Sequence, residues 1–417
     1  MLTQRLIKQS ASLSFSKRRK LLLLLFAIVG TFPVWFGFEH AYSAVVHPAT
    51  TLPPPRLVTT NVVSGKEPGA ADSIVGRVVD ARNIPVKGVQ VRVPGRLPVL
   101  TNAKGEFMLR GLSASDRLPV SFTAPGFMNT TRIFKVGSVA GGGTTVVIWA
   151  RSVPVSIDTR RGGKVRFRTG GGVTIVPNSL VDENGKPVRG IAKVSLTLLD
   201  VSDRNQLRSV PGDFTAQMSD KSIRMLESFG VFEISITDAR GRRTDFAPGK
   251  PAKFDLPIPA RLRRTAPKRS RLFSFNIESG RWLEEGEVVL TEQLFYSGTI
   301  TRTDWDWNVD DPLDTTCITI KFQDVYGSNS GPIANALVEA TGVSYSTISS
   351  GYTNSQGLVC LLVKINSAIV IKAYDPMYPT YPIGPATVTS PNVPAGAADC
   401  GDPVKCPLVI TMEQDAD

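Results

Sequence analysis

The residues of this chain whose chemistry is easiest to interpret are its four cysteines, Cys317, Cys360, Cys400 and Cys406. None of them has the CxxC spacing typical of a zinc site. All four fall in one part of a chain whose N-terminus has the pattern of an export signal, so we expect two disulfides formed in an oxidising compartment. Four cysteines allow three pairings. We favour Cys317–Cys360 with Cys400–Cys406.

Enzymatic chemistry finds little support in the sequence. The only histidines are His40 and His47, which precede the folded part of the chain. This excludes serine–histidine and cysteine–histidine catalysis, HExxH zinc sites and histidine bases from the remaining residues. A carboxylate-pair glycosidase needs only Asp and Glu, but the acidic run at 284–287 is typical of a solvated turn. We predict that the chain is not an enzyme, with no catalytic residue, metal site or cofactor.

An acidic segment at residues 299–315 resembles part of a calcium loop. Asp304, Asp306 and Asn308 have the spacing of the first half of an EF-hand. Val309 and Thr315 then stand where that loop needs Gly and Glu. We interpret residues 299–315 as an acidic, tryptophan-containing linker between domains, and leave a Ca²⁺ ion near Asp304–Asp314 as an open alternative.

Two sets of residues are candidates for binding a partner. The chain carries a formal charge of +12, and a dense basic cluster favours an anionic lipid or acidic polymer. This basic cluster comprises Arg261, Arg263, Arg264, Lys268, Arg269 and Arg271. Aromatic side chains could instead stack on a glycan: Trp282, Tyr352, Tyr374, Tyr378 and Tyr381. Nucleic acid is not expected, because no aromatic residues interleave the basic cluster.

The N-terminus directs the chain to a membrane. Residues 17–20, KRRK, precede an uncharged apolar stretch from Leu21 to Phe38. Small residues from Ala41 to Ala44 suit a signal peptidase, while the length of the apolar stretch also suits a single-pass anchor. Both remain open for residues 1–44. The proline-rich segment 45–72 is expected to be an extended linker. Because the N-terminal segment has the pattern of a translocation signal, we expect the protein to be extracellular, periplasmic or on the cell surface.

From Ser73 onward the sequence has the alternation and turn residues of antiparallel β-structure. The pattern I-x-G-x-V-x-D, P-V-x-G-V-x-V, T-x-x-x-G-x-F-x-L and P-G-F extends from Ile74 to Phe127. It closely resembles the carboxypeptidase regulatory-like domain, a β-sandwich of the transthyretin-like and carbohydrate-binding-like group. The resemblance implies an accessory module without chemistry of its own, over residues 73–152.

The C-terminal part, residues 316–414, repeats this plan in divergent form. Asn335 stands in the place of Gly88, and Thr353 to Leu361 corresponds to Thr101 to Leu109. Between the two copies, residues 159–298 form a larger β-sandwich module. Its order of strands and turns is similar to cartilage intermediate layer protein and related bacterial surface proteins, and its opening resembles ZU5-type sandwiches.

The sequence as a whole predicts an all-β protein of tandem antiparallel β-sandwiches that follow a signal or anchor helix and a linker. The predicted function is that of an exported, non-enzymatic structural or binding protein of the cell envelope or extracellular space. The alternative is a protein that binds a surface or extracellular glycan. Expected partners are a surface polymer or protein, a glycan or an anionic lipid.

Overall fold

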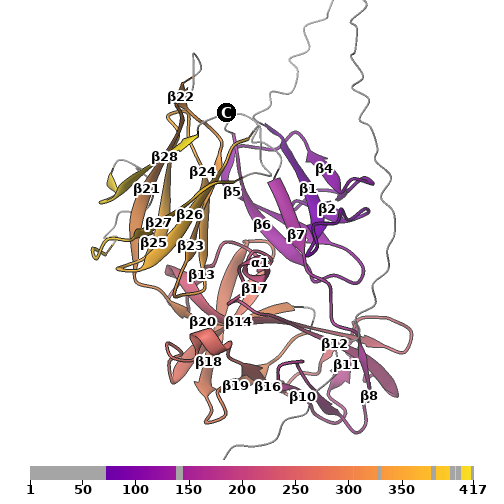
Figure 1. Cartoon of the computed structure of the whole chain (residues 1–417). Coiled ribbons are helices and arrows are strands. Elements are labelled where there is room, and N and C mark those ends of the chain that lie inside the picture. Colours follow the sequence, from indigo (N-terminus) through magenta and orange to yellow (C-terminus); the bar gives the residue numbers. More distant parts are fainter. Residues whose placement is uncertain are drawn as a thin grey trace, which may run out of the picture. The chain divides into compact units, whose positions relative to one another are not determined.

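The computed structural model describes residues 72–137, 144–303, 305–325, 330–376, 382–394, 400 and 405–414. All described residues belong to one compact unit (Figure 1). The expected signal or anchor at 1–44, and all of the linker before Asp72, lie outside the described residues. Within the described ranges, no helix has both the length and the apolar character that crossing a bilayer requires. The described chain is almost entirely β-structure, as predicted, and its buried side chains gather in three hydrophobic clusters.

The first sandwich packs a three-stranded sheet, ordered β4-β1-β7, against a four-stranded sheet, ordered β3-β2-β5-β6. β1 pairs antiparallel with β4 and parallel with β7. Alternate side chains of the strands point into the core, among them Val78, Val91 and Phe122, which are fully buried. The strands are β1 (Ile74–Asp80), β2 (Gln90–Arg92), β3 (Val99–Leu100), β4 (Glu106–Leu109), β5 (Ser115–Thr123), β6 (Thr130–Val136) and β7 (Thr144–Ile148).

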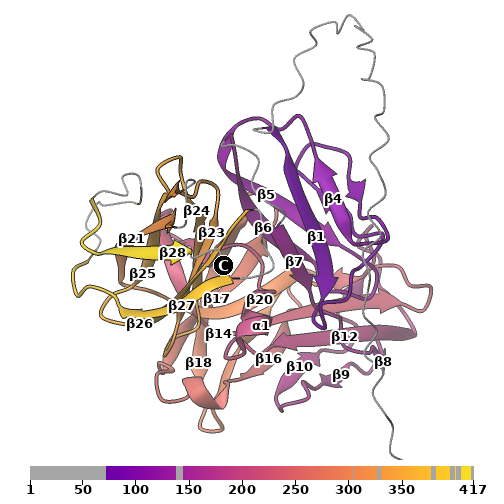
Figure 2. The same ribbon diagram turned by 45° about the horizontal axis from the view of Figure 1, so that its top comes forward.

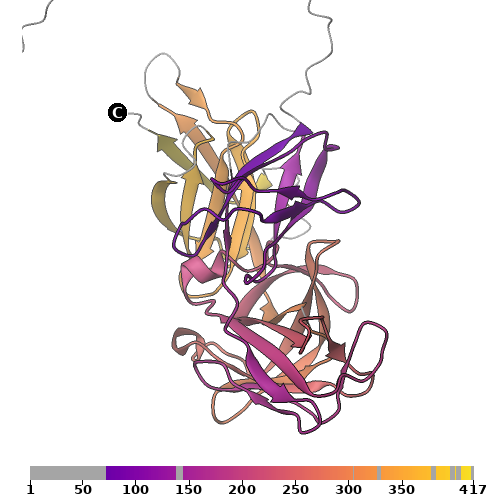
Figure 3. The ribbon, with the colours of Figure 1, turned by 90° about the vertical axis from the view of Figure 1, so that its right-hand side faces the viewer.

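The C-terminal sandwich has the same plan. β21 pairs antiparallel with β25 and parallel with β28, as β1 does with β4 and β7. Its second sheet, β24-β23-β26-β27, has the order of β3-β2-β5-β6. Figures 2 and 3 show this sandwich in orange to yellow from two further directions. The strands are β21 (Thr315–Asp324), β22 (Gly331–Pro332), β23 (Leu337–Gly342), β24 (Ile348–Tyr352), β25 (Leu358–Lys364), β26 (Ala368–Tyr374), β27 (Pro382–Thr389) and β28 (Val409–Gln414).

One turn shows why the two copies share a sequence pattern. The Thr101 hydroxyl donates to the carbonyl of Val86 at 2.7 Å and accepts from the amide of Val89 at 2.9 Å. Thr353 makes the same two contacts, at 2.7 Å with Ile333 and 2.9 Å with Ala336. Gly105 has φ +74°, and a Cβ there would lie 2.3 Å from the carbonyl oxygen of Val78, so only glycine fits this turn.

The middle module is built on an eleven-stranded sheet whose main path is β8-β12-β14-β20-β17-β18-β19-β16-β10-β9; β13 pairs with β14 and β18, and β11 pairs with β15 separately. Its large hydrophobic cluster includes Phe232, Phe254 and Trp282. The elements are β8 (Val155–Asp158), β9 (Gly163–Val165), β10 (Gly172–Ile175), β11 (Leu180–Val181), β12 (Ile191–Leu199), α1 (Arg204–Leu207), β13 (Thr215–Gln217), β14 (Ile223–Asp238), β15 (Asp245–Phe246), β16 (Ala252–Pro257), the 3₁₀ turn η2 (Ala260–Leu262), β17 (Arg269–Asn276), β18 (Arg281–Leu290), β19 (Phe295–Ile300) and β20 (Trp305–Pro312).

The segment that we interpreted as a linker, residues 299–315, contains one of the central strands of this sheet. β20 lies between β14 and β17 and pairs antiparallel with both. Trp307 and Val309 are buried in the hydrophobic cluster on one face of the strand. The linker interpretation was wrong because the acidic residues on the opposite face hid the alternation of a strand.

Candidate functional site

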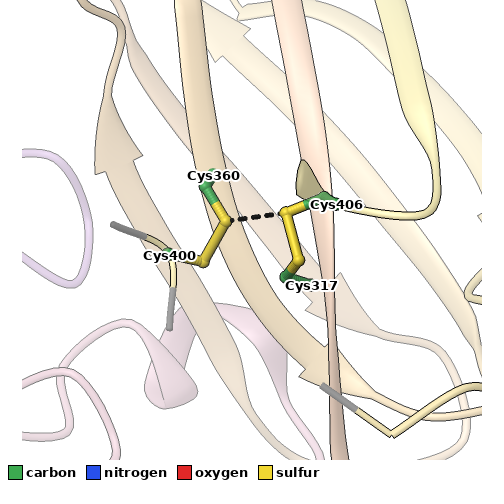
Figure 4. Close-up of a disulfide and its surroundings, with 4 residues drawn as sticks. All are labelled: Cys317, Cys360, Cys400 and Cys406. Atoms are coloured by element: carbon green, nitrogen blue, oxygen red, sulfur yellow. Dashed lines mark hydrogen bonds between the residues drawn. A yellow bond between two sulfur atoms is a disulfide. The ribbon is translucent and has the colours of Figure 1, made fainter. Parts of the chain in front are cut away.

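The four cysteines form two disulfides, as expected, but the favoured pairing was wrong. The bonds are Cys317–Cys406 and Cys360–Cys400, each with Cα atoms 5.2 Å apart (Figure 4). The β21–β25 register places Thr319, not Cys317, opposite Cys360. The parallel pairing of β28 begins at Thr319 and Val409. Cys317 lies two residues before Thr319 and Cys406 lies three residues before Val409, so the two cysteines come side by side.

The two disulfides differ in exposure and touch each other. Cys317 and Cys406 are buried, with exposed fractions of 1% and 7%, whereas Cys360 and Cys400 are half-buried. The Sγ atoms of Cys360 and Cys406, which belong to different disulfides, are 3.0 Å apart (Figure 4). The sulfur atoms of Cys317, Cys360 and Cys406 all lie within 4.8 Å of one another. Since each cysteine is bonded in a disulfide, none offers the thiolate that a metal ion would need.

The acidic residues of β20 are buried in the sheet and do not form a calcium loop. Asp306, Asn308 and Asp310 lie at alternate positions of the strand, so about 6.6 Å of backbone separates each from the next. An EF-hand loop folds around its ion, whereas these residues lie along an extended strand, so this segment does not have the backbone of that loop. Asp304 lies outside the described residues. Burial, followed by the charge of Glu233, raises the pKa of Asp306 well above its usual value.

The same face of the sheet holds hydrogen-bonding partners for these acids. Arg151 donates to both carboxylate oxygens of Glu233, at 2.8 and 2.7 Å. Glu233 lies opposite Asp306 in the β14–β20 register. The Ser228 hydroxyl donates to Asn308 Oδ1 at 2.6 Å, and the Asn308 amide donates to Asp310. Burial raises the pKa of Asp310 well above its usual value, so this ladder combines one ion pair with two acids whose charged forms burial disfavours.

The aromatic residues proposed for glycan stacking do not form one surface. Trp282 is fully buried and packs edge-on against Phe275, with ring centroids 5.1 Å apart. It was a wrong candidate, because strand alternation points it into the core of the middle module. Tyr378 and Tyr381 lie outside the described residues. Tyr352 and Tyr374 are half-buried and line a cavity of about 390 Å³.

Residues of all three sandwiches line this junction cavity. The first sandwich contributes Arg117 and Arg132, the middle module contributes Arg208 and Asp213, and the C-terminal sandwich contributes Glu339, Tyr352 and Tyr374. Arg117 donates to both carboxylate oxygens of Asp213. Arg208 donates to Glu339 and to the Tyr374 hydroxyl. The arginines are thus largely matched by acids from a different sandwich.

The electrostatics of the junction cavity follow from burial. Arg132 donates to the carbonyl oxygens of Thr131 and Val210, at 3.0 and 2.8 Å, and to that of Arg208. Burial lowers its pKa to about 10. Burial alone would lower the pKa of Arg208, but Glu339 and Tyr374 raise it above its usual value. Burial, and then the charge of Glu339, raise the pKa of Tyr374 to about 12.

The basic cluster is partly neutralised within its own sheet. Arg269 lies 3.1 Å from the Glu287 carboxylate, and Arg271 lies 3.5 Å from that of Glu284, across the β17–β18 pair. Two further arginines donate to carbonyl oxygens, Arg261 to Val343 at 3.4 Å and Arg263 to Ile258 at 3.2 Å. Arg264 and Lys268 are exposed beside them.

Sequence reasoning missed the residues that join the sandwiches, which are Arg117, Arg132, Arg151, Arg208, Asp213, Glu227, Glu233 and Glu339. Each lies in a strand or a short turn, and its partner lies in another module. The charge pattern of one segment gives no signal for such a pair.

Comparison with solved structures finds two major pilins and the TIE protein at low similarity. The TIE protein of Bacillus anthracis is 12% identical with TM-score 0.17, and the match covers 82% of this chain and 50% of that one, so this chain spans about half its length. BcpA, the major pilin subunit of Bacillus cereus, is 10% identical with TM-score 0.16 and coverages of 83% and 99%. The full-length major pilin SpaD of Corynebacterium diphtheriae is 9% identical with TM-score 0.17 and coverages of 82% and 96%. With such TM-scores, the likeness carries no argument about this chain.

Among curated proteins, none matches the chain significantly. The expected similarity of the middle module to cartilage intermediate layer protein stays a prediction. One family model does match: residues 73–167 match the carboxypeptidase regulatory-like domain, which confirms the resemblance that the pattern from Ile74 to Phe127 predicted.

Proposed function

We propose that this chain is an exported, non-enzymatic structural protein that acts as a rigid spacer of three β-sandwiches at the cell surface or outside the cell. The observation that carries the proposal is that each sandwich is hydrogen-bonded to both of the others. Arg151 pairs with Glu233 between the first and middle modules, and Lys364 pairs with Glu227 between the C-terminal and middle modules at 2.7 Å. The Thr144 and Tyr352 hydroxyls, 3.1 Å apart, join the first module to the last.

Apolar packing supports the same proposal. Met128 of the first sandwich is buried in the hydrophobic cluster of the middle module. Met225 of the middle module is buried in the cluster of the C-terminal sandwich. A side chain that inserts into a neighbouring core cannot leave without opening a cavity, so the joints are expected to resist bending. The two disulfides support residence in an oxidising compartment.

Calorimetry tests the rigid spacer. If the sandwiches are mechanically coupled, the purified chain should unfold in one cooperative transition. The double variant Arg117→Ala/Arg208→Ala removes two junction contacts and should split or broaden the transition. The control is Arg82→Ala, since Arg82 pairs with Asp80 within the first sandwich. Separate transitions in the wild type would contradict the proposal.

The junction cavity supports a second candidate, the binding of a glycan. Tyr352 and Tyr374 line this cavity together with hydrogen-bonded arginines and acids, and planar polar side chains beside aromatic rings suit sugar hydroxyls. Titration with neutral oligosaccharides tests it by calorimetry. Binding that is insensitive to salt and lost in Tyr374→Ala would support the glycan. No heat with any oligosaccharide, or equal binding by Tyr374→Ala, would refute it.

A further inference from the structure

The two disulfides of the C-terminal sandwich are arranged as an outer and an inner bond. The outer disulfide joins the half-buried Cys360 and Cys400, and the inner disulfide joins the buried Cys317 and Cys406. A thiol that approaches from solvent therefore meets the outer disulfide first. The Sγ atom of Cys360 is 3.0 Å from that of Cys406, in contact with the inner bond (Figure 4).

We propose that Cys400 is a site of covalent capture for a thiol, which an internal disulfide exchange makes persistent. The thiolate of the incoming molecule attacks Sγ of Cys400 and forms a mixed disulfide, and the electron pair of the broken bond leaves on Sγ of Cys360. The Cys360 thiolate then attacks Sγ of Cys406. The Cys317–Cys406 bond breaks, and Cys317 takes the proton that the incoming thiol lost. Each exchange breaks one disulfide bond and forms one, so the chain and the incoming molecule together start and end with two disulfide bonds and one thiol, with no external oxidant or reductant.

The backbone keeps the released Cys360 sulfur beside its target. Cys360 lies within β25, which pairs with β21 over seven consecutive positions from Thr315 to Lys321. This ladder prevents Cys360 from turning away after the outer bond breaks. Cys406 lies three residues before β28, which pairs in parallel with the other edge of β21 and so keeps Cys406 near that strand. The second exchange therefore needs side-chain rotation rather than unfolding.

The products of the exchange suit their surroundings. Cys317, with an exposed fraction of 1%, becomes a buried neutral thiol, which is a common state for cysteine in protein cores. The new Cys360–Cys406 bond spans 46 residues in place of the 89 that the Cys317–Cys406 bond spans. Because the entropy of loop closure changes only with the logarithm of loop length, the segment before β28 stays fastened almost as well as before. Without a nearby thiolate, the captured molecule is not expelled from Cys400.

Peptide mapping tests the relay directly, because trypsin places each cysteine on a different peptide. The peptides are residues 303–321, 322–364, 373–405 and 406–417. The purified oxidised chain is treated with one equivalent of glutathione, quenched with acid, alkylated with N-ethylmaleimide in denaturant at mildly acidic pH and digested without reductant. We expect glutathione on 373–405, a crosslink between 322–364 and 406–417, and N-ethylmaleimide on 303–321. Glutathione on 373–405 with N-ethylmaleimide on 322–364, and an intact link from 303–321 to 406–417, would overturn the relay.

A double variant provides a second test. Cys317→Ser/Cys400→Ser retains only Cys360 and Cys406, whose sulfur atoms are in contact, and should form their disulfide without added thiol. Its matched control, Cys317→Ser/Cys360→Ser, retains Cys400 and Cys406. We expect the first variant to titrate with no free thiol after unfolding in acid. Two free thiols per chain in a folded first variant would refute the proposal, and the wild-type mapping decides the matter if that variant fails to fold.

Discussion

Replacing Glu233 by glutamine tests whether the joint between the first and middle sandwiches depends on a buried ion pair. The Glu233 side chain is 1% exposed and that of Arg151 is 23% exposed. The two make a bidentate contact, with distances of 2.8 and 2.7 Å. Glutamine has nearly the same shape but no charge, so the variant removes the charge of the carboxylate that the Arg151 guanidinium binds.

The expected cost is set by the burial of the two partners. Removing one member of a fully buried pair costs about 3–5 kcal/mol, because the other charge stays uncompensated. Arg151 retains some contact with water, which places the expected loss at the low end, about 2–3 kcal/mol. Asp306 offers partial compensation: once the like charge of Glu233 is gone, its raised pKa should fall toward the usual value, and its carboxylate could pair with Arg151. The double variant Glu233→Gln/Asp306→Asn removes this compensation and should cost more than the two single changes together.

Urea unfolding at neutral pH measures these free energies. The control is Glu287→Gln, which removes the exposed pair with Arg269 and should have no measurable effect, since both side chains are more than half exposed. Our reasoning would be refuted if Glu233→Gln unfolded at the wild-type urea concentration, or if the double variant were merely additive.

Further predictions concern pH, the core and the charged surface. The pKa of Asp306 is raised above 3.8 in the folded chain, so the folded state holds its proton where the unfolded state releases it, and this residue lowers the free energy of unfolding as pH rises above about 4. Asp306→Asn should therefore be more stable than wild type at pH 8 and lose that gain toward pH 4. A pH-independent difference in urea unfolding would argue against this. Trp282→Ala should lower the free energy of unfolding by about 3–5 kcal/mol and leave oligosaccharide titrations of the folded protein unchanged, because the indole packs in the core. A variant that stays stable but loses oligosaccharide binding would show instead that Trp282 stacks on the glycan. Arg264→Glu/Lys268→Glu should abolish any salt-sensitive binding to anionic phosphatidylserine vesicles. Arg269→Glu should weaken this binding less, because Glu287 already offsets the charge of Arg269. Equal losses in the two variants would place the vesicle-binding surface elsewhere.

Local structure was predictable from the sequence because the residues that determine it are close together. The threonine of the T-x-x-x-G turn, Thr101, bonds to Val86 and Val89 just before β2, and Gly105 takes a positive φ beside the carbonyl oxygen of Val78 in β1. The threonine and the glycine stand four residues apart in both copies, so the same pattern identified the turn at Gly105 and at Gly357. Asn335, placed opposite Gly88 by the repeat, takes φ +61° where Gly88 has +76°, and asparagine is among the few residues that tolerate this region.

The disulfide pairing and the acidic strand were not predictable for the opposite reason. Cys317 and Cys406 meet through a parallel ladder between β21 and β28, and sequence alone does not give the register of strands so far apart. β20 contains Asp306, Asn308 and Asp310 on the face that a central strand usually fills with apolar side chains. Ser228 of β14 binds Asn308, and Arg151 after β7 binds Glu233, which lies opposite Asp306, so the polarity of the segment is understandable only once the three elements are assembled.

The position of β20 also bears on how the C-terminal sandwich is held. β20 ends at Pro312 and β21 begins at Thr315, which leaves Leu313 and Asp314 between a central strand of one module and the first strand of the next. Leu313 is buried in the C-terminal core, and its amide donates to the carbonyl of Met225 on β14 at 2.8 Å. To bend at this point, the chain would have to break that bond and either pull β20 from between β14 and β17 or withdraw Leu313 from its core. Each change exposes apolar surface, so the segment that resembles a flexible linker in the sequence is one of the reasons to expect a stiff molecule.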